Sequence, residues 1–314
     1  MNALPPITIG LPVFNGAKYL TEAIESLRAQ TFTDYELIIS DNASTDSTEE
    51  IARAAASEDG RITYHRHDIN GGGPANYNFV LGESRSEYFM WHAHDDLRDR
   101  RFLELAHGVM VTTSDVSVTF SRAIAIGPDG EELGLVPRPD DLIHDSADHR
   151  LRAVIAAPRP ELVLFGLMRR GLLGLTGEHR KFKGGDRILV AEMALLGRFV
   201  ELPDILFLNR DHPDRYTRMA HGPEAELARR EWWDPSSAEI VMPRWRGLGA
   251  YIGMVWRHPL SVGQRVRCGL ALGQSLLDNR MYFSKQLGRE ALGVVPAVVS
   301  KLVRSTSSQA KTRP

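Results

Sequence analysis

Apolar residues fall into short strand-like runs and helix-spaced stripes along the first part of the chain. After the first run, apolar residues recur at helical spacing from Tyr19 to Leu27, which predicts a helix with one buried face. Alternation of strands and helices is typical of an α/β sheet whose parallel strands are joined by crossover helices. The runs that predict buried strands are residues 7–14, 35–40, 61–67, 87–92 and 116–126.

Polar and special residues between these runs mark the expected helix starts. Ser47 with Glu50 three residues later predicts a capping box at the start of a second helix. Pro74 follows a glycine turn and suits the first position of a third helix, which runs to about Glu83.

The pattern changes in the second half of the chain. Residues 131–180 show weak periodicity and clustered prolines, which predicts loops and helices lying over the sheet. Two late strands are predicted at 199–202 and 205–209. Helical spacing then returns from about residue 224, where an apolar stripe lies on one helix face and comprises Val262, Val266, Leu270 and Leu277.

Composition narrows the class of protein. The chain has 314 residues, 43% hydrophobic and 25% charged, which fits a folded protein with one large domain and room for an appendage. The single cysteine, Cys268, excludes an internal disulfide and fits a reducing compartment. We see no signal-peptide pattern and no apolar run of membrane-spanning length, so we expect a cytoplasmic protein.

Charge is distributed unevenly along the chain. The net charge is −2, which argues against a dedicated nucleic-acid binder. From Val241 to Pro314, however, twelve Lys and Arg face only two acids, so this segment carries +10 and the rest −12. Such a basic segment predicts an anionic partner, and we expect peripheral association with an anionic membrane surface, at the inner face of the plasma membrane.

Candidate chemistry gathers where the predicted strands end. Residues 12–15 follow the first strand, Asp41 and Asn42 the second, and Asp95 and Asp96 the fourth. In an open α/β sheet, ligands bind beyond the carboxyl ends of the strands. Two acidic clusters in one crevice repel each other unless a cation joins them, and a divalent metal with bound phosphates does so. The pattern therefore predicts Mg²⁺ or Mn²⁺ as a cofactor.

Several segments together resemble the family 2 glycosyltransferases. The shared features at residues 7–48 are a Pro-x-Phe-Asn turn, a Tyr-Glu-Leu-Ile-Ile strand and an Asp-Asn-x-Ser-Thr-Asp loop. EYFMWHAHDD resembles the family's metal-binding strand end, and GGDRILVAEMALLGRF resembles its catalytic-base region. The resemblance implies a GT-A, Rossmann-like α/β fold with a mostly parallel sheet, and an inverting transfer from a nucleotide sugar.

The resemblance also implies roles for individual residues. Asp186 matches the general base, and Asp96 matches the metal ligand. Three residues of a later segment match a diphosphate-binding loop, although a surface ion-pair patch is an equal alternative: Arg210, His212 and Arg215. The residues that match the nucleotide-sugar site are Pro12, Phe14, Asn15, Asp41, Asn42 and Asp95.

Two departures from the family pattern bear on these roles. Ala93 stands where the family often has a further Asp, and Gly185 stands where an acidic pair is common. His92 and His94 share a face if the strand continues, and either could supply a nitrogen ligand to the metal. Asp186 also has an alternative role as a helix cap.

The sequence as a whole predicts a GT-A domain at 1–225 and a helical, basic C-terminal extension at 226–314. Within the domain, residues 1–125 form the donor half and residues 126–225 the acceptor half. The expected enzyme is a metal-dependent, hexosyltransferase-type glycosyltransferase that uses a UDP- or dTDP-sugar. Its acceptor is a hydroxyl of a glycan or glycolipid in surface polysaccharide or cell-envelope biosynthesis. Two alternatives are a degenerate nucleotide-binding protein on the same scaffold and, less favoured, a nucleotidyltransferase.

Overall fold

The computed structural model describes most of the chain. The described residues are 4–138, 140–157, 159–215, 218, 232–233, 235, 243–278 and 288. The expected domain boundary at 225/226 and the last part of the basic extension lie outside them.

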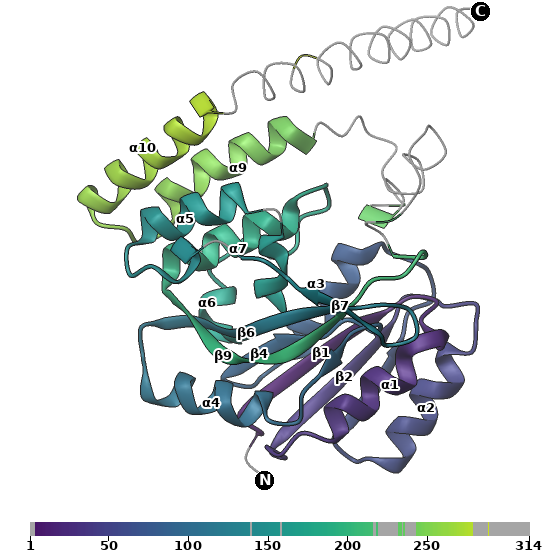
Figure 1. The fold of residues 1–314 in the computed structure, drawn as a ribbon. Coiled ribbons are helices and arrows are strands. Elements are labelled where there is room, and N and C mark those ends of the chain that lie inside the picture. Colours follow the sequence, from purple (N-terminus) through teal and green to yellow (C-terminus); the bar gives the residue numbers. More distant parts are fainter. Residues whose placement is uncertain are drawn as a thin grey trace, which may run out of the picture.

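A mixed β-sheet runs through the centre of the molecule (Figure 1). Within the described residues its strand order is β3-β2-β1-β4-β8-β6-β9-β5, with β7 paired to the outside of β6. Strands β3, β2, β1 and β4 are parallel, as are β6 and β9, whereas β8 runs antiparallel to β4 and β6. The strands are β1 Ile7–Val13, β2 Tyr35–Asp41, β3 Ile62–Arg66, β4 Tyr88–Trp91, β5 Leu97–Arg98, β6 Val116–Ile126, β7 Glu132–Leu135, β8 Leu167–Arg169 and β9 Arg198–Arg210.

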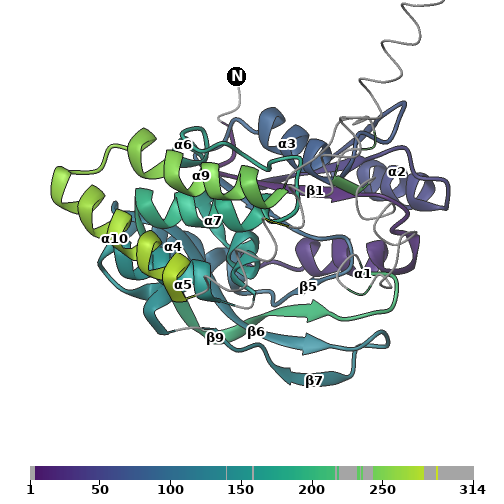
Figure 2. The same ribbon diagram turned by 90° about the horizontal axis from the view of Figure 1, so that it is seen from above.

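Helices cover both faces of the sheet (Figures 1 and 2). Helices α1, α2 and α4 lie on one face, and α3, α5, α7, α9 and α10 on the other. The helices are α1 Ala17–Arg28, α2 Thr48–Glu58, α3 Gly73–Glu83, α4 Phe102–Thr112, α5 Ala147–Ala156, α6 Arg170–Leu173, α7 Gly185–Leu196, α9 Pro243–Arg257 and α10 Val262–Asp278, with 3-10 turns η1 Asp140–Ile143 and η2 Pro160–Phe165.

The sheet separates two hydrophobic cores because its side chains alternate between its faces. In β4, Phe89 and Trp91 pack towards α3, α5 and α7, whereas Tyr88 and Met90 pack towards α1 and α4. A strand that is buried on both faces reads as a continuous apolar run, which is the pattern of the YFMW segment.

The predicted α/β class is confirmed, and so are the five strands and three helices predicted in the first 126 residues, whereas β5 and α4, which lie between β4 and β6, were not predicted. The expected strand at 116–126 coincides with β6. The capping box at Ser47 is wrong, because the Ser47 side chain makes no cap hydrogen bond and Asp46 Oδ1 accepts the Thr48 amide at 3.1 Å instead. The two late strands are one strand, β9, whose pairing with β6 is irregular between the predicted halves.

The described C-terminal helices, α9 and α10, pack on α5 and α7. Met254 of α9 and Cys268 of α10 are fully buried in the core that α7 also lines. The apolar stripe predicted on α10 faces away from this core, and its residues are exposed. None of the described helices has the length and apolar character needed to cross a bilayer.

Gly10 of β1 allows helix α3 to approach the sheet closely. A Cβ at this position would lie 2.5 Å from Val80 Cγ2 and 2.9 Å from Phe89 Cζ. We expect Gly10→Ala to lower the free energy of unfolding by about 1–3 kcal/mol, because both neighbours are buried and must move. Urea unfolding followed by circular dichroism measures this change.

Gly108→Ala in α4 is the matched control, because a Cβ there meets nothing within 4 Å. Its unfolding free energy should rise by up to about 1 kcal/mol, since alanine favours a helix over glycine. An unfolding midpoint for Gly10→Ala at or above that of the unchanged protein would contradict the close approach.

Candidate functional site

The carboxyl ends of β1, β2 and β4 meet at one edge of the sheet. Val13 is opposite Asp41 in the β1–β2 ladder, and Gly10 is opposite Trp91 in the β1–β4 ladder. Pairing continues beyond the strands, since the Asn42 amide donates to Val13 O at 2.9 Å. The structure therefore brings the three predicted strand-end segments together.

Asp41 is fully buried at the end of β2 and is extensively hydrogen-bonded. Its Oδ2 accepts from Arg66 Nη1 at 2.5 Å and from Tyr64 Oη at 2.8 Å. Its Oδ1 accepts from the Ser44 amide at 2.8 Å. These bonds fix the carboxylate at the floor of the expected nucleotide site and compensate its burial.

The loops beside Asp41 are held by amide side chains. Asn15 adopts a left-handed φ of 50°, and its Oδ1 accepts the Thr45 amide at 2.8 Å. Asn42 Oδ1 accepts the Gly71 amide at 2.9 Å, which holds the glycine turn before α3. Phe14 is 41% exposed at this edge, so its ring is accessible to a ligand.

Strand β9 holds the Asp95–Asp96 turn from the other side of the site. Asn209 Nδ2 donates to both oxygens of Asp96, at 3.0 and 3.1 Å, and the Arg210 amide donates to Asp96 Oδ1 at 2.8 Å. His212 Nε2 lies 3.0 Å from Asp95 Oδ2. The structure thus joins two acids from the first half of the chain to a segment more than 110 residues later.

The two acids have different protonation behaviour. Burial, and then the charge of Asp95, raise the pKa of Asp96 to about 7. Burial also opposes ionisation of Asp95, but the hydrogen bond from His212 together with the nearby charges of His94, Arg215 and His212 outweighs it and lowers the pKa of Asp95 below its ordinary value. Adjacent buried carboxylates of this kind attract a cation to the turn.

Arg210 does not lie in the position expected of a diphosphate clamp. Its side chain is 1% exposed, with Nε donating to Asp95 O at 2.9 Å and Nη2 donating to Glu22 Oε2 at 2.6 Å. These contacts make Arg210 a brace for the acidic turn. Arg215 is partly exposed, and its charge faces both Asp95 and Asp96, so it is better placed than Arg210 to meet a diphosphate.

The two histidines before the acids have different environments. His92 is fully buried, with Nε2 3.2 Å from Asp96 O, and burial lowers its pKa to about 3, so it stays neutral. His94 is partly exposed and packs on the turn after β1, where a Cβ on Gly16 would lie 2.7 Å from its ring. His92 therefore belongs to the scaffold, and His94 is the more accessible of the two.

Asp186 lies in the first turn of α7, and burial raises its pKa. It shares an electrostatic environment with the acidic turn through Tyr77 of α3. Burial, followed by the charges of Asp95, Asp96 and Asp186, raises the pKa of the Tyr77 phenol. Sequence reasoning did not single out Tyr77, which only the folded arrangement places beside these acids.

Buried polar atoms without a hydrogen-bond partner also occur at this turn. Within the described residues they include Tyr19 Oη, His92 Nδ1 and His212 Nδ1. The ring of His212 lies 4.9 Å from that of Tyr19. Such groups are uncommon in folded proteins and cluster at sites that receive a ligand.

The donor atoms at the turn are of the kind that bind a divalent metal ion. The turn offers the carboxylate oxygens of Asp95 and Asp96, which are of the type that Mg²⁺ and Mn²⁺ prefer, whereas His212 Nε2 is engaged by Asp95 Oδ2. No group of three or more such side chains forms a ready-made metal cluster in the described part of the chain. The arrangement fits a cation that takes few protein ligands and completes its shell with phosphate and water.

The chain is similar to a protein family, to individual relatives in sequence and to solved structures. Residues 8–171, more than half of the chain, match the family model of "Glycosyl transferase family 2". An uncharacterized glycosyltransferase of Rickettsia typhi is 41% identical over 93 residues, which are 30% of this chain and 28% of that protein. The putative glycosyltransferase EpsE of Bacillus subtilis is 34% identical over 105 residues, 33% of this chain and 38% of EpsE. The match thus covers well under half of each relative.

Solved structures resemble the fold over most of the chain. Residues 1–349 of TarS from S. aureus, in complex with UDP-GlcNAc, give a TM-score of 0.61 at 15% identity, covering 90% of this chain and 80% of that one. The mannosyltransferase PcManGT from Pyrobaculum calidifontis, in complex with GDP-Man and Mn²⁺, gives 0.55 at 16% identity, covering 99% and 81%. At these identities the likeness establishes the fold.

Proposed function

Because the chain belongs to glycosyl transferase family 2, we propose that it is an inverting glycosyltransferase that moves a sugar from a nucleoside diphosphate to an acceptor hydroxyl. The observation that carries this proposal is the Asp95–Asp96 turn, which two separate halves of the chain hold at the carboxyl edge of the sheet. The family resemblance further favours a UDP- or dTDP-hexose as donor, and surface polysaccharide or cell-envelope assembly as the pathway.

The nucleotide lies, in this proposal, across the ends of β1 and β2. Phe14 provides an exposed ring, and Pro12 and Asn15 shape the turn around the base and ribose. Asp41 and Asn42 form the floor, and their bonds to neighbouring loops keep it rigid. A rigid floor lowers the entropy cost of ordering the donor on binding.

Asp95 and Asp96 would hold the divalent metal, with Asp96 as the principal ligand and Asp95 nearer the ribose. His212 orients Asp95, and His94 is the accessible nitrogen beside the turn. When bound, the metal neutralises charge on the diphosphate leaving group. Arg215 adds a cation on the same side and stabilises that charge further.

Asp186 is the proposed general base. Burial raises its pKa, so the carboxylate accepts a proton more readily than an exposed aspartate does. Its place at the start of α7 puts it in the acceptor half proposed at residues 126–225, opposite the donor half at 1–125. The segment 226–314 is then the C-terminal extension.

We also propose that the extension associates with an anionic membrane. Two stripes of exposed side chains support this: Trp245, Ile252 and Trp256 on α9, which are 44, 49 and 69% exposed, and Val262, Val266, Leu270 and Leu277 on α10, which are 56–78% exposed. Arg265 lies 6.0 Å from the Trp256 ring and bridges the two stripes. Exposed apolar helices beside basic residues are typical of helices that lie in the membrane interface.

The donor site is tested first by thermal shift. UDP-, dTDP-, GDP- and CDP-sugars are added with and without Mn²⁺ to the unchanged protein and to Asp96→Asn. We expect the sugars of one nucleotide class to stabilise the protein in the presence of Mn²⁺. At a ligand concentration of a hundred times Kd, the free energy of unfolding should rise by about 3 kcal/mol. Asp96→Asn should lose the metal-dependent part, because the amide cannot replace a carboxylate ligand.

Asp34→Asn is the matched control, since Asp34 is an exposed acid just before β2, at the opposite edge of the sheet. It should retain the full shift. Stabilisation by nucleotide without any metal effect or turnover would instead favour the degenerate scaffold. No shift with any nucleotide would contradict the donor site itself.

Substitution of Asp186 separates catalysis from a structural role. We expect Asp186→Asn to keep the donor's thermal shift while nucleoside diphosphate release falls by about 10²-fold or more. Asp186 Oδ1 accepts the Arg187 amide at 2.8 Å, and the amide oxygen of asparagine can accept the same bond, so a purely structural Asp186 would tolerate the change. Asp148→Asn, in the first turn of α5, is the control for an acidic helix start outside the site.

The pH dependence gives a second measure of the same role. A base must be deprotonated, so activity should rise with pH through the pKa of Asp186, which burial places above its ordinary value. Unaltered diphosphate release in Asp186→Asn would exclude it as the base.

Membrane association is measured by vesicle co-sedimentation. The unchanged protein should bind vesicles of phosphatidylglycerol and phosphatidylcholine more tightly than phosphatidylcholine alone. The double variant Trp256→Ser and Leu270→Ser should bind at least about tenfold more weakly, because it loses two apolar side chains from the interface.

Val111→Ser is the control, since Val111 is 56% exposed on α4 at the opposite face of the sheet. Equal binding to neutral and anionic vesicles would argue against the electrostatic part. A dimer in light scattering that the double variant disrupts would assign the stripes to a second copy of the chain instead.

A further inference from the structure

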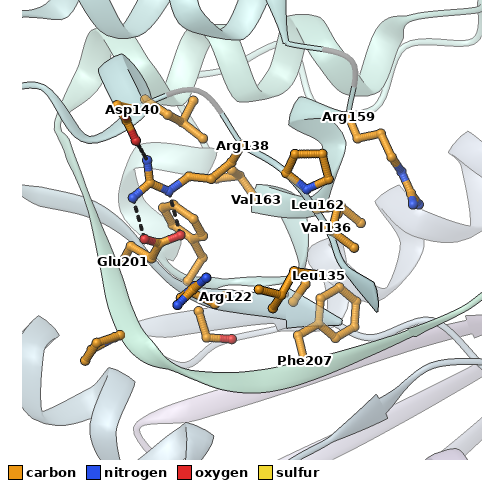
Figure 3. Close-up of a pocket in the computed structure, with 16 residues that line it drawn as sticks. Arg122, Leu135, Val136, Arg138, Asp140, Arg159, Leu162, Val163, Glu201 and Phe207 are labelled. Carbon is orange, nitrogen blue, oxygen red and sulfur yellow. Dashed lines mark hydrogen bonds and ion pairs between the residues drawn. The ribbon is translucent and has the colours of Figure 1, made fainter. Parts of the chain in front are cut away.

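A cavity of about 560 Å³ lies beside the acidic turn and has no role in the donor site proposed above. Strands β6 and β9 form its floor, and the segments around η1 and η2 form its walls (Figure 3). The close-up shows Arg122 extending from the floor into the space between Glu201 and Leu135. A cavity of this size accommodates one or two sugar rings.

Arg159 connects the cavity directly to the proposed metal ligand. It lines the cavity wall, and its Nη2 donates to Asn209 Oδ1 at 2.7 Å. The same Asn209 donates through Nδ2 to both carboxylate oxygens of Asp96. Phe207, two residues before Asn209 on β9, also lines the cavity. The side chain of Asn209 therefore lies between the cavity wall and the acidic turn.

The pairing of the two floor strands is irregular at Ser121 and Arg122. The register between β6 and β9 shifts on both sides of Arg122, from Ser121 to Arg122 and from Arg122 to Ala123. Irregular pairing of this kind re-aims side chains and is common beside active sites. Here four consecutive residues of β6, from Phe120 to Ala123, line the cavity, and Arg122 is the exposed one among them.

These two side chains lack partners within the protein. Ser121 is 7% exposed, and its hydroxyl has no hydrogen-bond partner in the described part of the chain. Arg122 is exposed and makes no ion pair or hydrogen bond with any described residue. The Ser121 hydroxyl oxygen is itself buried, so Arg122 is the polar side chain of the floor that a ligand in the cavity can reach.

The acids of the cavity do not neutralise Arg122. Glu201 is held by Arg138 through two hydrogen bonds of 2.6 Å, and Arg138 also bonds to Asp140. Because this two-bond pairing with Arg138 occupies both oxygens of Glu201, its carboxylate already has a partner other than Arg122. Arg122 thus remains a positive charge among apolar wall side chains, which include Leu135, Val136, Leu162 and Phe207.

We propose that this cavity is an acceptor subsite for an acidic sugar, whose carboxylate or phosphate pairs with Arg122. The apolar wall contacts the faces of the sugar ring and excludes water, which strengthens the ion pair. That the ligand is an acceptor rests on the proposed glycosyl transfer, whereas binding of the acidic sugar does not. The inference therefore names the substrate class of the transferase: an acceptor with a negatively charged substituent.

The experiment measures direct binding, with no donor present. Methyl α-D-glucuronide, glucose 6-phosphate and the neutral methyl α-D-glucoside are titrated into the full chain by saturation-transfer NMR. We expect at least one acidic sugar to bind about ten- to a hundredfold more tightly than the neutral glucoside. The tighter of the two acidic probes identifies carboxylate or phosphate as the preferred group.

Substitutions then assign this preference to the cavity. Arg122→Gln should remove the difference between acidic and neutral sugars. Arg152→Gln is matched to Arg122→Gln, because Arg152 is another exposed arginine, on α5, and its loss changes the net charge equally. It should leave the preference intact.

Three outcomes would overturn the proposal: equal binding of acidic and neutral sugars, a preference that survives Arg122→Gln, or a preference that Arg152→Gln removes equally. The donor thermal shift is recorded for the same variants. An intact shift with no acidic-sugar binding refutes this subsite alone, whereas acidic-sugar binding without any donor shift refutes the transferase and keeps the subsite.

Discussion

The hydrogen bonds between strand β9 and the Asp95–Asp96 turn are the constraint on which the rest of the site depends. Two adjacent carboxylates inside a protein repel each other, and each loses its hydration. Asn209 and the Arg210 amide compensate Asp96, and His212 compensates Asp95. The acids can therefore remain buried at the sheet edge only while β9 keeps its register beside them.

Arg210 extends this constraint to the elements around the site. Its guanidinium bonds to Asp95 O, to Glu22 of α1 and to Pro128 O in the turn after β6, and it lies 4.6 Å from the Tyr19 ring. A buried arginine with partners on three elements fixes them relative to one another, since any displacement leaves a charge unpaired. The proposed donor half and the proposed acceptor half meet at this residue.

Local pattern predicted much of the fold, because strands buried on both faces and one-sided helices have distinct periodicities. It correctly predicted β6 at 116–126, and that the strand ending at Asp41 and the strand before Asp95 end at one edge of the sheet. It did not predict that Arg210 is a brace, because that role depends on contacts with Glu22, 188 residues earlier. Periodicity also showed that Leu270 lies on a helical stripe, but the smaller Cys268 and Ala271 face the core instead. The catalytic role of Asp186 stays a prediction, since its place in the first turn of α7, where its Oδ1 accepts the Arg187 amide, fits a structural role as well as catalysis.

The C-terminal helices are joined to the proposed active site through a buried charge, so they are more than an appendage. Glu192 of α7 is fully buried and pairs with Arg257 of α9 and with Arg180, at 3.0 Å, in the loop before Asp186. Its Oε2 also accepts the Gly177 amide at 2.9 Å. Because one carboxylate holds both α9 and this loop, displacing α9 would leave Glu192 underpaired and disturb the approach to Asp186. A membrane bound at the α9–α10 stripes would then contact a surface packed on α7, whose first turn holds the proposed base. It would also face the side of the sheet that carries the cavity proposed to bind an acidic sugar.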